Sequence, residues 1–133
     1  MSQENVNRLI ELADAFNRED IKGFMAVLDP EVEFIPQQAM LEGTYRGREG
    51  VFAWFRDMAA TYDSNDGDLD LTDVRDLGDQ VLAIGSVSFT GRGSGIQTNV
   101  PVAVVATFRE GLLTHFKDYA DKSAALKAAG LSE

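Results

Sequence analysis

The sequence predicts a single α+β domain, in which helices come first and a curved antiparallel sheet follows. The first half of the chain has apolar residues at helical spacing. The second half has alternating β-forming segments separated by short turns. The 133 residues contain no internal repeat and no obvious linker, so residues 1–133 are expected to form one domain.

Three N-terminal segments have the pattern of helices. In the first, residues 4–17, the apolar residues share one helical face: Val6, Leu9, Ile10, Ala13 and Phe16. Residues 17–30 predict a tight connection and a second short helix, which ends before Pro30 because a helix cannot easily continue there. Residues 48–62 predict a third helix, and its apolar face holds Val51, Trp54, Phe55 and Met58.

The remaining segments predict strands and a closing helix. Residues 31–36 alternate as a short strand, and residues 37–47 read as a loop. Further strands follow, with turns at 77–79, 91–95 and 110–111, so we expect an antiparallel meander and a sheet of about four to six strands. A strongly curved sheet under helices encloses a cone, and a cone leaves a pocket.

The C-terminal segment, residues 120–131, predicts a short helix. Asp121 or Ser123 is a credible N-cap, because both side chains accept hydrogen bonds from free helical N–H groups. Gly130 is a suitable C-terminal stop.

Composition and charge exclude several classes of function. A formal net charge of −10 repels phosphate backbones, so neither nucleic acid nor an anionic membrane is expected as a partner. The chain has neither a signal-peptide pattern nor a long apolar run, which predicts a cytoplasmic protein. It contains no cysteine and a single histidine, so neither a thiolate nor a multi-histidine metal site is expected. Any acid–base chemistry then falls mainly to carboxylates, Tyr or Lys.

Three stretches of the chain look familiar: "NREDIKGFMAVLDPEVEFIP", "YRGREGVFAWF" and "FREGLLTHFKDYADKSAALKAAGL". Together they resemble the nuclear transport factor 2-like superfamily, and within it the SnoaL-like, or polyketide cyclase-like, branch. The resemblance implies a cone-shaped sheet packed on three N-terminal helices, and a homodimer formed through the outer face of the sheet. The abundance of aromatic residues, together with Met40 and Met58, favours a small apolar or aromatic ligand in the cone.

The same resemblance compares the chain with three enzyme types. Ketosteroid isomerases carry functional groups at positions that here are Leu12, Ile35 and Ala106, so that activity is not expected. Limonene-1,2-epoxide hydrolases match in the final aspartate of their set, which corresponds to Asp118. Their Arg and first Asp belong to a strand that here offers only Ser86 and Ser88. SnoaL-like cyclases use a pocket aspartate as a base and require few other groups, which this sequence can satisfy.

Asp118 is therefore the predicted catalytic residue. Side chains alternate along a strand, so Thr114, Phe116 and Asp118 should share one face. The resemblance implies that this face lines the cone. Leu113 and His115 should then lie on the opposite face, where His115 is a surface or interface residue. A carboxylate among apolar side chains loses hydration, which disfavours its charged form and makes it a stronger base.

Around Asp118 we expect a set of substrate-binding residues from the helices and strands: Phe16, Phe34, Phe55, Met58, Ser86, Ser88, Val102, Val104 and Phe116. The leading hypothesis is a cofactor-independent isomerase, cyclase or hydrolase. The alternative is a non-catalytic domain that binds a small ligand in the same pocket.

Several other motifs have plainer interpretations. "GRGSG" at 91–95 lacks the spacing of a dinucleotide-binding loop and predicts a hairpin tip over the pocket mouth. The acidic run at 63–79 lacks the full pattern of a calcium-binding loop, so a solvated strand face is favoured. Arg46 could reach a ligand carboxylate or pair with an acidic neighbour. The favoured interpretation is that Arg46 is a loop residue in contact with water.

Overall fold

The computed structural model describes residues 2–36, 44–62 and 68–131. The elements in these ranges are α1 (Ser2–Asn17), α2 (Ile21–Ala26), β1 (Leu28–Ile35), β2 (Tyr45–Arg46), α4 (Gly47–Thr61), β3 (Asp68–Asp76), β4 (Gln80–Thr90), β5 (Gln97–Arg109), β6 (Leu112–Asp118) and α5 (Lys122–Ala128). This order confirms the predicted α+β class. The predicted turns at 77–79, 91–95 and 110–111 each join two consecutive strands.

The strands form a mixed sheet in the order β2-β1-β6-β5-β4-β3. Strands β3 to β6 form the predicted antiparallel meander, but β1 pairs with β6 in the parallel sense. The prediction of a wholly antiparallel sheet was therefore wrong at this one pairing. Parallel neighbours need a long crossover between them, and here α4 and the rest of the meander provide it.

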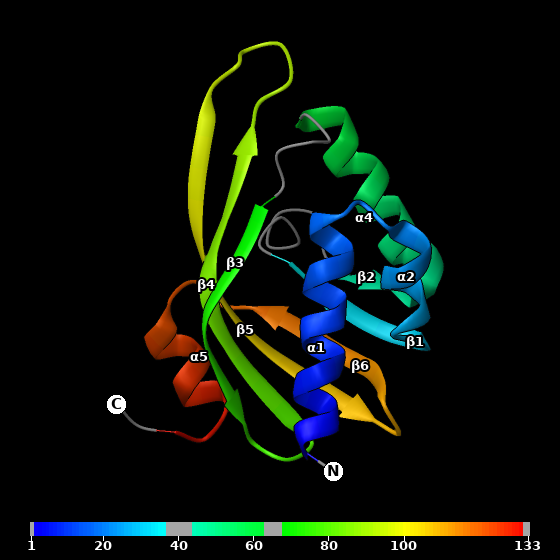
Figure 1. Ribbon diagram of the computed structural model, residues 1–133, viewed down its shortest axis with the longest axis vertical. Coiled ribbons are helices and arrows are strands. Elements are labelled where there is room, and N and C mark those ends of the chain that lie inside the picture. Colours follow the sequence, from blue (N-terminus) through cyan, green and yellow to red (C-terminus); the bar gives the residue numbers. More distant parts are fainter. Residues whose placement is uncertain (1, 37–43, 63–67, 132–133) are drawn as a thin grey trace.

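The two faces of the sheet are covered differently (Figure 1). Helices α1, α2 and α4 lie together over one face, which we call the inner face, and α5 lies against the other, the outer face. The hairpin of β4 and β5 projects beyond the rest of the molecule. The inner face and its helices hold most of the buried residues of the described chain, including Leu28, Val32, Phe34 and Val51.

A β-bulge between β5 and β6 reverses one predicted orientation. Thr107 pairs with His115, but the next pair along is Phe108 with Leu113, so Thr114 is the extra residue. Leu113 therefore packs in the inner core, where Thr114 was expected. The Thr114 hydroxyl instead donates to the carbonyl oxygen of Thr107 at 3.2 Å. Phe116, beyond the bulge, keeps its inward position.

A second bulge bends the sheet between β3 and β4. It lies between Leu71 and Asp73, opposite Gly85. A Cβ atom at Gly85 would lie only 2.0 Å from the carbonyl oxygen of Asp70, so no other residue fits this approach without a backbone shift. This close contact accounts for the glycine in the middle of a long strand.

The α1 helix buries the predicted face with one exception. Leu9 is buried and Phe16 packs against the core, whereas Ile10 is 49% exposed. Leu12, which was not part of the predicted face, is also buried. In α4, Val51 and Trp54 are buried, and Phe55 and Met58 pack at the edge of the same cluster.

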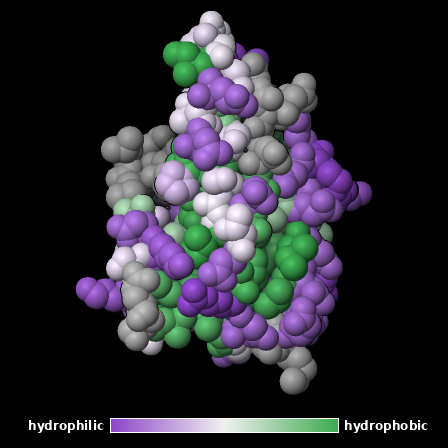
Figure 2. All heavy atoms as spheres, turned by 60° about the vertical axis from the view of Figure 1, so that its left-hand side comes forward, coloured by the Kyte–Doolittle hydropathy of each residue, from purple (hydrophilic) through white to green (hydrophobic). Residues whose placement is uncertain are grey.

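The outer face carries a smaller apolar cluster under α5. Leu82, Ala103 and Val105 of the sheet pack there against Ala125 and Leu126. Figure 2 turns this side toward the reader and shows apolar atoms gathered in its lower half, bordered by polar ones. No helix in the described ranges has both the length and the apolar character that crossing a bilayer would require. The homodimer expected on this face stays a prediction.

The capping predictions for α5 are confirmed. Asp121 Oδ1 accepts a hydrogen bond from the backbone N–H of Ala124 at 2.8 Å. Gly130 has a φ of 78°, the left-handed conformation that ends many helices.

Candidate functional site

A cavity of about 310 Å³ lies between the inner face of the sheet and the helices. Its described lining residues come from both layers: Leu9, Leu12, Ala13, Phe16, Phe24, Phe34, Pro36, Trp54, Tyr62, Leu69, Leu71, Ala83, Val87, Phe89, Val100, Val102, Val104, Phe116 and Asp118. Aliphatic and aromatic side chains dominate this wall, which is the usual character of a small-molecule site.

Asp118 is the one carboxylate among these lining residues. It is the last residue of β6 and pairs across the sheet with Val104. Its Oδ1 accepts a hydrogen bond from the backbone N–H of Ala103 at 3.1 Å, which ties the half-buried side chain to the end of the sheet. The Ala103 carbonyl oxygen accepts the next N–H, that of Tyr119, at 2.7 Å. The carboxylate is thus held by the strand that lines the cavity.

A chain of aromatic contacts crosses the cavity wall. The Trp54 and Phe34 ring centroids are 4.9 Å apart, and Phe34 stacks on Phe116 at 4.6 Å. Phe16 and Phe24 flank the indole at 6.0 and 6.4 Å. These rings come from α1, α2, α4, β1 and β6, so the wall depends on packing between the two layers.

The predicted substrate-binding residues divide into two groups. The structure places Phe16, Phe34, Val102, Val104 and Phe116 in the cavity wall beside Asp118. Phe55 and Met58 pack against the inner core without lining the cavity.

Ser86 and Ser88 also lie outside the cavity wall, in contrast to the prediction. Val87 between them lines the cavity, and adjacent side chains of a strand point to opposite faces. Ser88 Oγ accepts a hydrogen bond from Asn99 Nδ2 at 2.8 Å on the outer side. The resemblance indicated β4, which does line the cavity, but Ser86 and Ser88 lie on the face of β4 that points away from the cavity.

Several lining residues were not in the predicted set. Trp54 lines the cavity, although the sequence predicted it only as part of the apolar face of its helix. Leu12 also lines the cavity, although it was compared only with a functional position of ketosteroid isomerases. Leu69 and Leu71 of β3, and Val87 and Phe89 of β4, repeat at a spacing of two, which is the signal that could have found them.

The projecting hairpin is joined to the end of α4 beside the cavity. Tyr62 and Phe89, which both line it, stack with ring centroids 4.7 Å apart. Arg92 of the hairpin tip donates from Nε to the Ala59 carbonyl oxygen at 2.9 Å, and from a terminal nitrogen to the Tyr62 carbonyl oxygen at 3.2 Å. The guanidinium therefore satisfies carbonyl groups that the helix end leaves open. The glycine-rich segment is a hairpin tip, as predicted.

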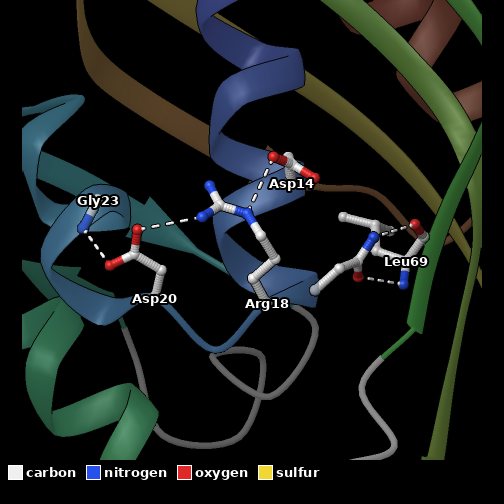
Figure 3. A network of polar contacts seen from close by, with 6 residues as sticks. Asp14, Arg18, Asp20, Gly23 and Leu69 are labelled. Atoms are coloured by element: carbon white, nitrogen blue, oxygen red, sulfur yellow. Dashed lines mark hydrogen bonds and ion pairs between the residues drawn. The ribbon is translucent and has the colours of Figure 1, made fainter.

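A polar network fixes α1 against β3 and α2 (Figure 3). Asn17 Nδ2 donates to the Leu69 carbonyl oxygen at 2.9 Å, and the Leu69 N–H donates to Asn17 Oδ1 at 2.7 Å. The amide thus pairs with the edge of β3 as another strand would. Arg18 bridges Asp14 and Asp20, and Asp20 caps α2 through the Gly23 N–H.

The other candidate residues lie elsewhere. Arg46 pairs with Glu33, and His115 Nε2 is 4.0 Å from a carboxylate oxygen of the same glutamate. Neither Arg46 nor His115 lines the cavity. In the described ranges, no group of three or more His, Cys, Asp or Glu residues could hold a metal ion. Residues 63–67 of the acidic run lie outside the described residues.

The chain is similar to a known domain family and to several solved structures. The family model of the SnoaL-like domain matches residues 9–116. A nuclear transport factor 2-like protein of unknown function from Burkholderia pseudomallei superposes with a TM-score of 0.80, at 24% identity over 96% of this chain and 97% of that one. No curated protein matches the sequence at a significant level.

Two further solved structures share the fold. TerC, co-crystallised with polyporic acid, has a TM-score of 0.78 and 20% identity, over 96% of this chain and 98% of that one. A candidate polyketide cyclase from Xanthomonas campestris has a TM-score of 0.73 and 20% identity, over 96% and 98% of the two chains. At these identities the likeness establishes the fold alone.

Proposed function

The chain belongs to the SnoaL-like domain family, and on that premise we propose that it is a small-molecule enzyme using Asp118 as general acid and base. The substrate would be apolar or aromatic, and the reaction an isomerisation, cyclisation or hydrolysis without metal or organic cofactor. The observation that carries the proposal is the single carboxylate in a described cavity wall that is mainly aliphatic and aromatic.

The chemistry follows from that placement. Asp118 would remove a proton from a carbon next to a substrate carbonyl group, leaving an enolate in the cavity. Return of the proton to another carbon gives an isomer, whereas attack of the enolate carbon on a second carbonyl closes a ring. The aromatic wall would hold the substrate in position and keep water from the enolate.

The relatives support an organic small molecule as the ligand. One neighbour was co-crystallised with polyporic acid, and another is a candidate polyketide cyclase. A non-catalytic binding domain is the second candidate. It is favoured by the bond that Asp118 already accepts from Ala103, and by the scarcity of acid–base partners, since Tyr62 supplies the other titratable side chain of the described wall.

The proposal is tested by proton exchange at carbon, which requires no knowledge of the product. β-Tetralone has acidic C–H groups beside a ketone, and its exchange in deuterium oxide is followed by proton NMR. We expect the wild-type protein to accelerate this exchange above buffer, and Asp118→Asn to lower the acceleration by about 10² to 10⁴-fold.

Asp121→Asn is the matched control, because it makes the same chemical change three residues away and asparagine still caps a helix. Equal exchange rates for the wild-type protein and Asp118→Asn would rule out Asp118 as the base. Binding of β-tetralone by the wild-type protein without faster exchange would instead favour the binding domain.

A further inference from the structure

The strand register shows where Asp118 lies along the cavity. Asp118 pairs with Val104, and Val104 pairs with Ala83, so these three residues form one row across the inner face. Phe89 lies six residues beyond Ala83 on β4, which at about 3.3 Å per residue is roughly 20 Å along the strand. On the other side of the row the next inward residue of β6 is Phe116. The carboxylate therefore lies near one end of the cavity and Phe89 near the other.

Tyr62 and Phe89 form the described wall at the end of the cavity remote from Asp118. Their rings stack with centroids 4.7 Å apart and an interplanar angle of 26°. Tyr62 directly follows α4, and an isolated β-bridge joins it to Gly91 of the hairpin. The position of the stack therefore depends on how the end of α4 is held against the hairpin.

Arg92 holds the end of α4. Tyr62, the residue after the helix, is extended rather than left-handed, with φ of −127° and ψ of 156°. The last carbonyl groups of the helix then need donors from elsewhere. The backbone N–H of Arg92 donates to the Thr61 carbonyl oxygen at 2.9 Å. Its guanidinium donates to the carbonyl oxygens of Ala59 and Tyr62, at 2.9 and 3.2 Å. Arg92 is not among the described lining residues, so any effect on a ligand passes through the stacked rings.

Resting on the proposed function of the cavity, we propose that Arg92 is a positioning residue that limits the length of the ligand. From Asp118 the longer stretch of the cavity runs along β4 and β5, past the paired residues Val87 and Val100, to the stack. A ligand whose reacting group lies at Asp118 extends its apolar part in this direction and ends at the two rings. Arg92 fixes that end because one guanidinium fork holds the carbonyl group of Tyr62 and the preceding helical turn together, which a lysine cannot do.

A homologous series of ligands tests this inference. The probes are the straight-chain methyl ketones from 2-hexanone to 2-dodecanone, which offer acidic C–H groups to Asp118 and lengthen by one methylene at a time. Trp54 is the single tryptophan and lines the cavity, so its fluorescence reports binding. In the wild-type protein Kd should fall by about 4-fold per methylene until the chain reaches the stack, and no further beyond it. We call this chain length the length limit.

Arg92→Met should raise the length limit, because the guanidinium no longer ties Tyr62 to the hairpin. We expect 2-dodecanone to bind about 10-fold more tightly than it does to the wild-type protein, the gain of one or two further methylenes. Affinity for 2-hexanone, which is too short to reach the stack, should stay the same. Phe89→Ala removes one of the two rings directly and should raise the limit with Arg92 still in place.

Arg56→Met is the matched control, because it removes the same group from an exposed position of α4 that does not line the cavity. It should leave the length limit unchanged. The competing explanation is that Arg92 only stabilises the helix end and the hairpin. It predicts a lower free energy of unfolding for Arg92→Met but the same length limit as the wild-type protein. That result would overturn the inference, as would a wild-type protein that has no limit or binds none of these ketones.

The length limit and the proposed catalysis are tested separately. Asp118→Asn should lose the exchange of β-tetralone and keep the length limit, because Asp118 does not contribute to the stack. A limit that moves with Arg92, in a protein that does not accelerate β-tetralone exchange, would support the role of Arg92 and reject Asp118 as the base. The opposite pair of results would reject the role of Arg92 and leave the base in place.

Discussion

The inner and outer faces of the sheet are built from the same strands, but the inner face holds the larger apolar core and the cavity, and the outer face holds a smaller apolar cluster beside charged residues. Val100, Val102 and Val104 of β5 line the cavity, while the residues between them face outward. On the outer face α5 covers a small apolar cluster, and β3 presents the ion pair of Asp73 and Arg75. A carboxylate is ordinary on the outer face and unusual on the inner one, so Asp118 stands out by its position rather than by its residue type.

The two faces also stabilise the fold in different ways. Inner-face residues contribute through packing, which pH and salt scarcely change. Charged groups of the outer face are partly solvated, so their contributions are small and depend on pH. Substitutions on the two faces should therefore differ in size and in their response to solution conditions.

The largest effect is expected for Phe34→Ala on the inner face. Phe34 is 1% exposed, and its ring contacts Phe24, Trp54 and Phe116. Removing a buried phenyl ring leaves a void that the neighbours fill only in part, so the free energy of unfolding should fall by about 3–5 kcal/mol. Urea denaturation followed by circular dichroism measures this loss.

Ser86→Ala is the outer-face control for that substitution. It removes one half-buried hydroxyl from the outer face of β4, and its effect on the free energy of unfolding should stay within about 0.5 kcal/mol. Similar losses in the two variants would contradict the division between the faces.

An intermediate effect is expected for Asn17→Asp at the edge of β3. The aspartate still accepts the Leu69 N–H, but it cannot donate to the Leu69 carbonyl oxygen and places an acceptor against it. We expect a loss of about 1 kcal/mol in the free energy of unfolding. Faster amide hydrogen exchange along β3 would locate the damage.

Asn7→Asp is the matched control, because it adds the same charge to α1. Asn7 is exposed and its Oδ1 accepts from Gln3, a bond that an aspartate can keep. If both variants lost equal stability, added negative charge rather than the pairing with Leu69 would be the cause.

Much of the fold could be predicted because its signals are local. Turn residues located the hairpins, helical spacing located α1 and α4, and Asp121 indicated the cap of α5. The parallel pairing of β1 with β6 could not be predicted, because it joins segments far apart in the sequence. The bulge at Thr114 was also missed, since one extra residue reverses the alternation without changing residue type.

The same distinction applies to the candidate site. Alternation beyond the bulge gave the correct inward position for Phe116, whereas Ser86 and Ser88 were assigned by resemblance to a strand rather than to a face. The contacts that Arg92 makes with the end of α4 had no signal in the sequence, because they join residues that only the folded chain brings together.

The smallest expected effect is electrostatic and belongs to the outer face. Two nitrogens of the Arg75 guanidinium donate to the two carboxylate oxygens of Asp73, at 3.4 and 3.1 Å. This hydrogen bonding lowers the pKa of Asp73 below its ordinary value of 3.8, partial burial opposes the shift, and the charges of Arg75 and Lys122 add to the lowering.

Because the pKa is lower in the folded chain, the pair stabilises the fold above pH 3.8 and loses its contribution as the pH falls through the folded-state value. Unfolding midpoints of the wild-type protein and Arg75→Met should therefore differ slightly at neutral pH and converge in acid. High salt should narrow the neutral-pH difference, because the pair is partly exposed. A difference that persisted in acid would assign the effect to packing of the Arg75 side chain, and the outer face would then resemble the inner one.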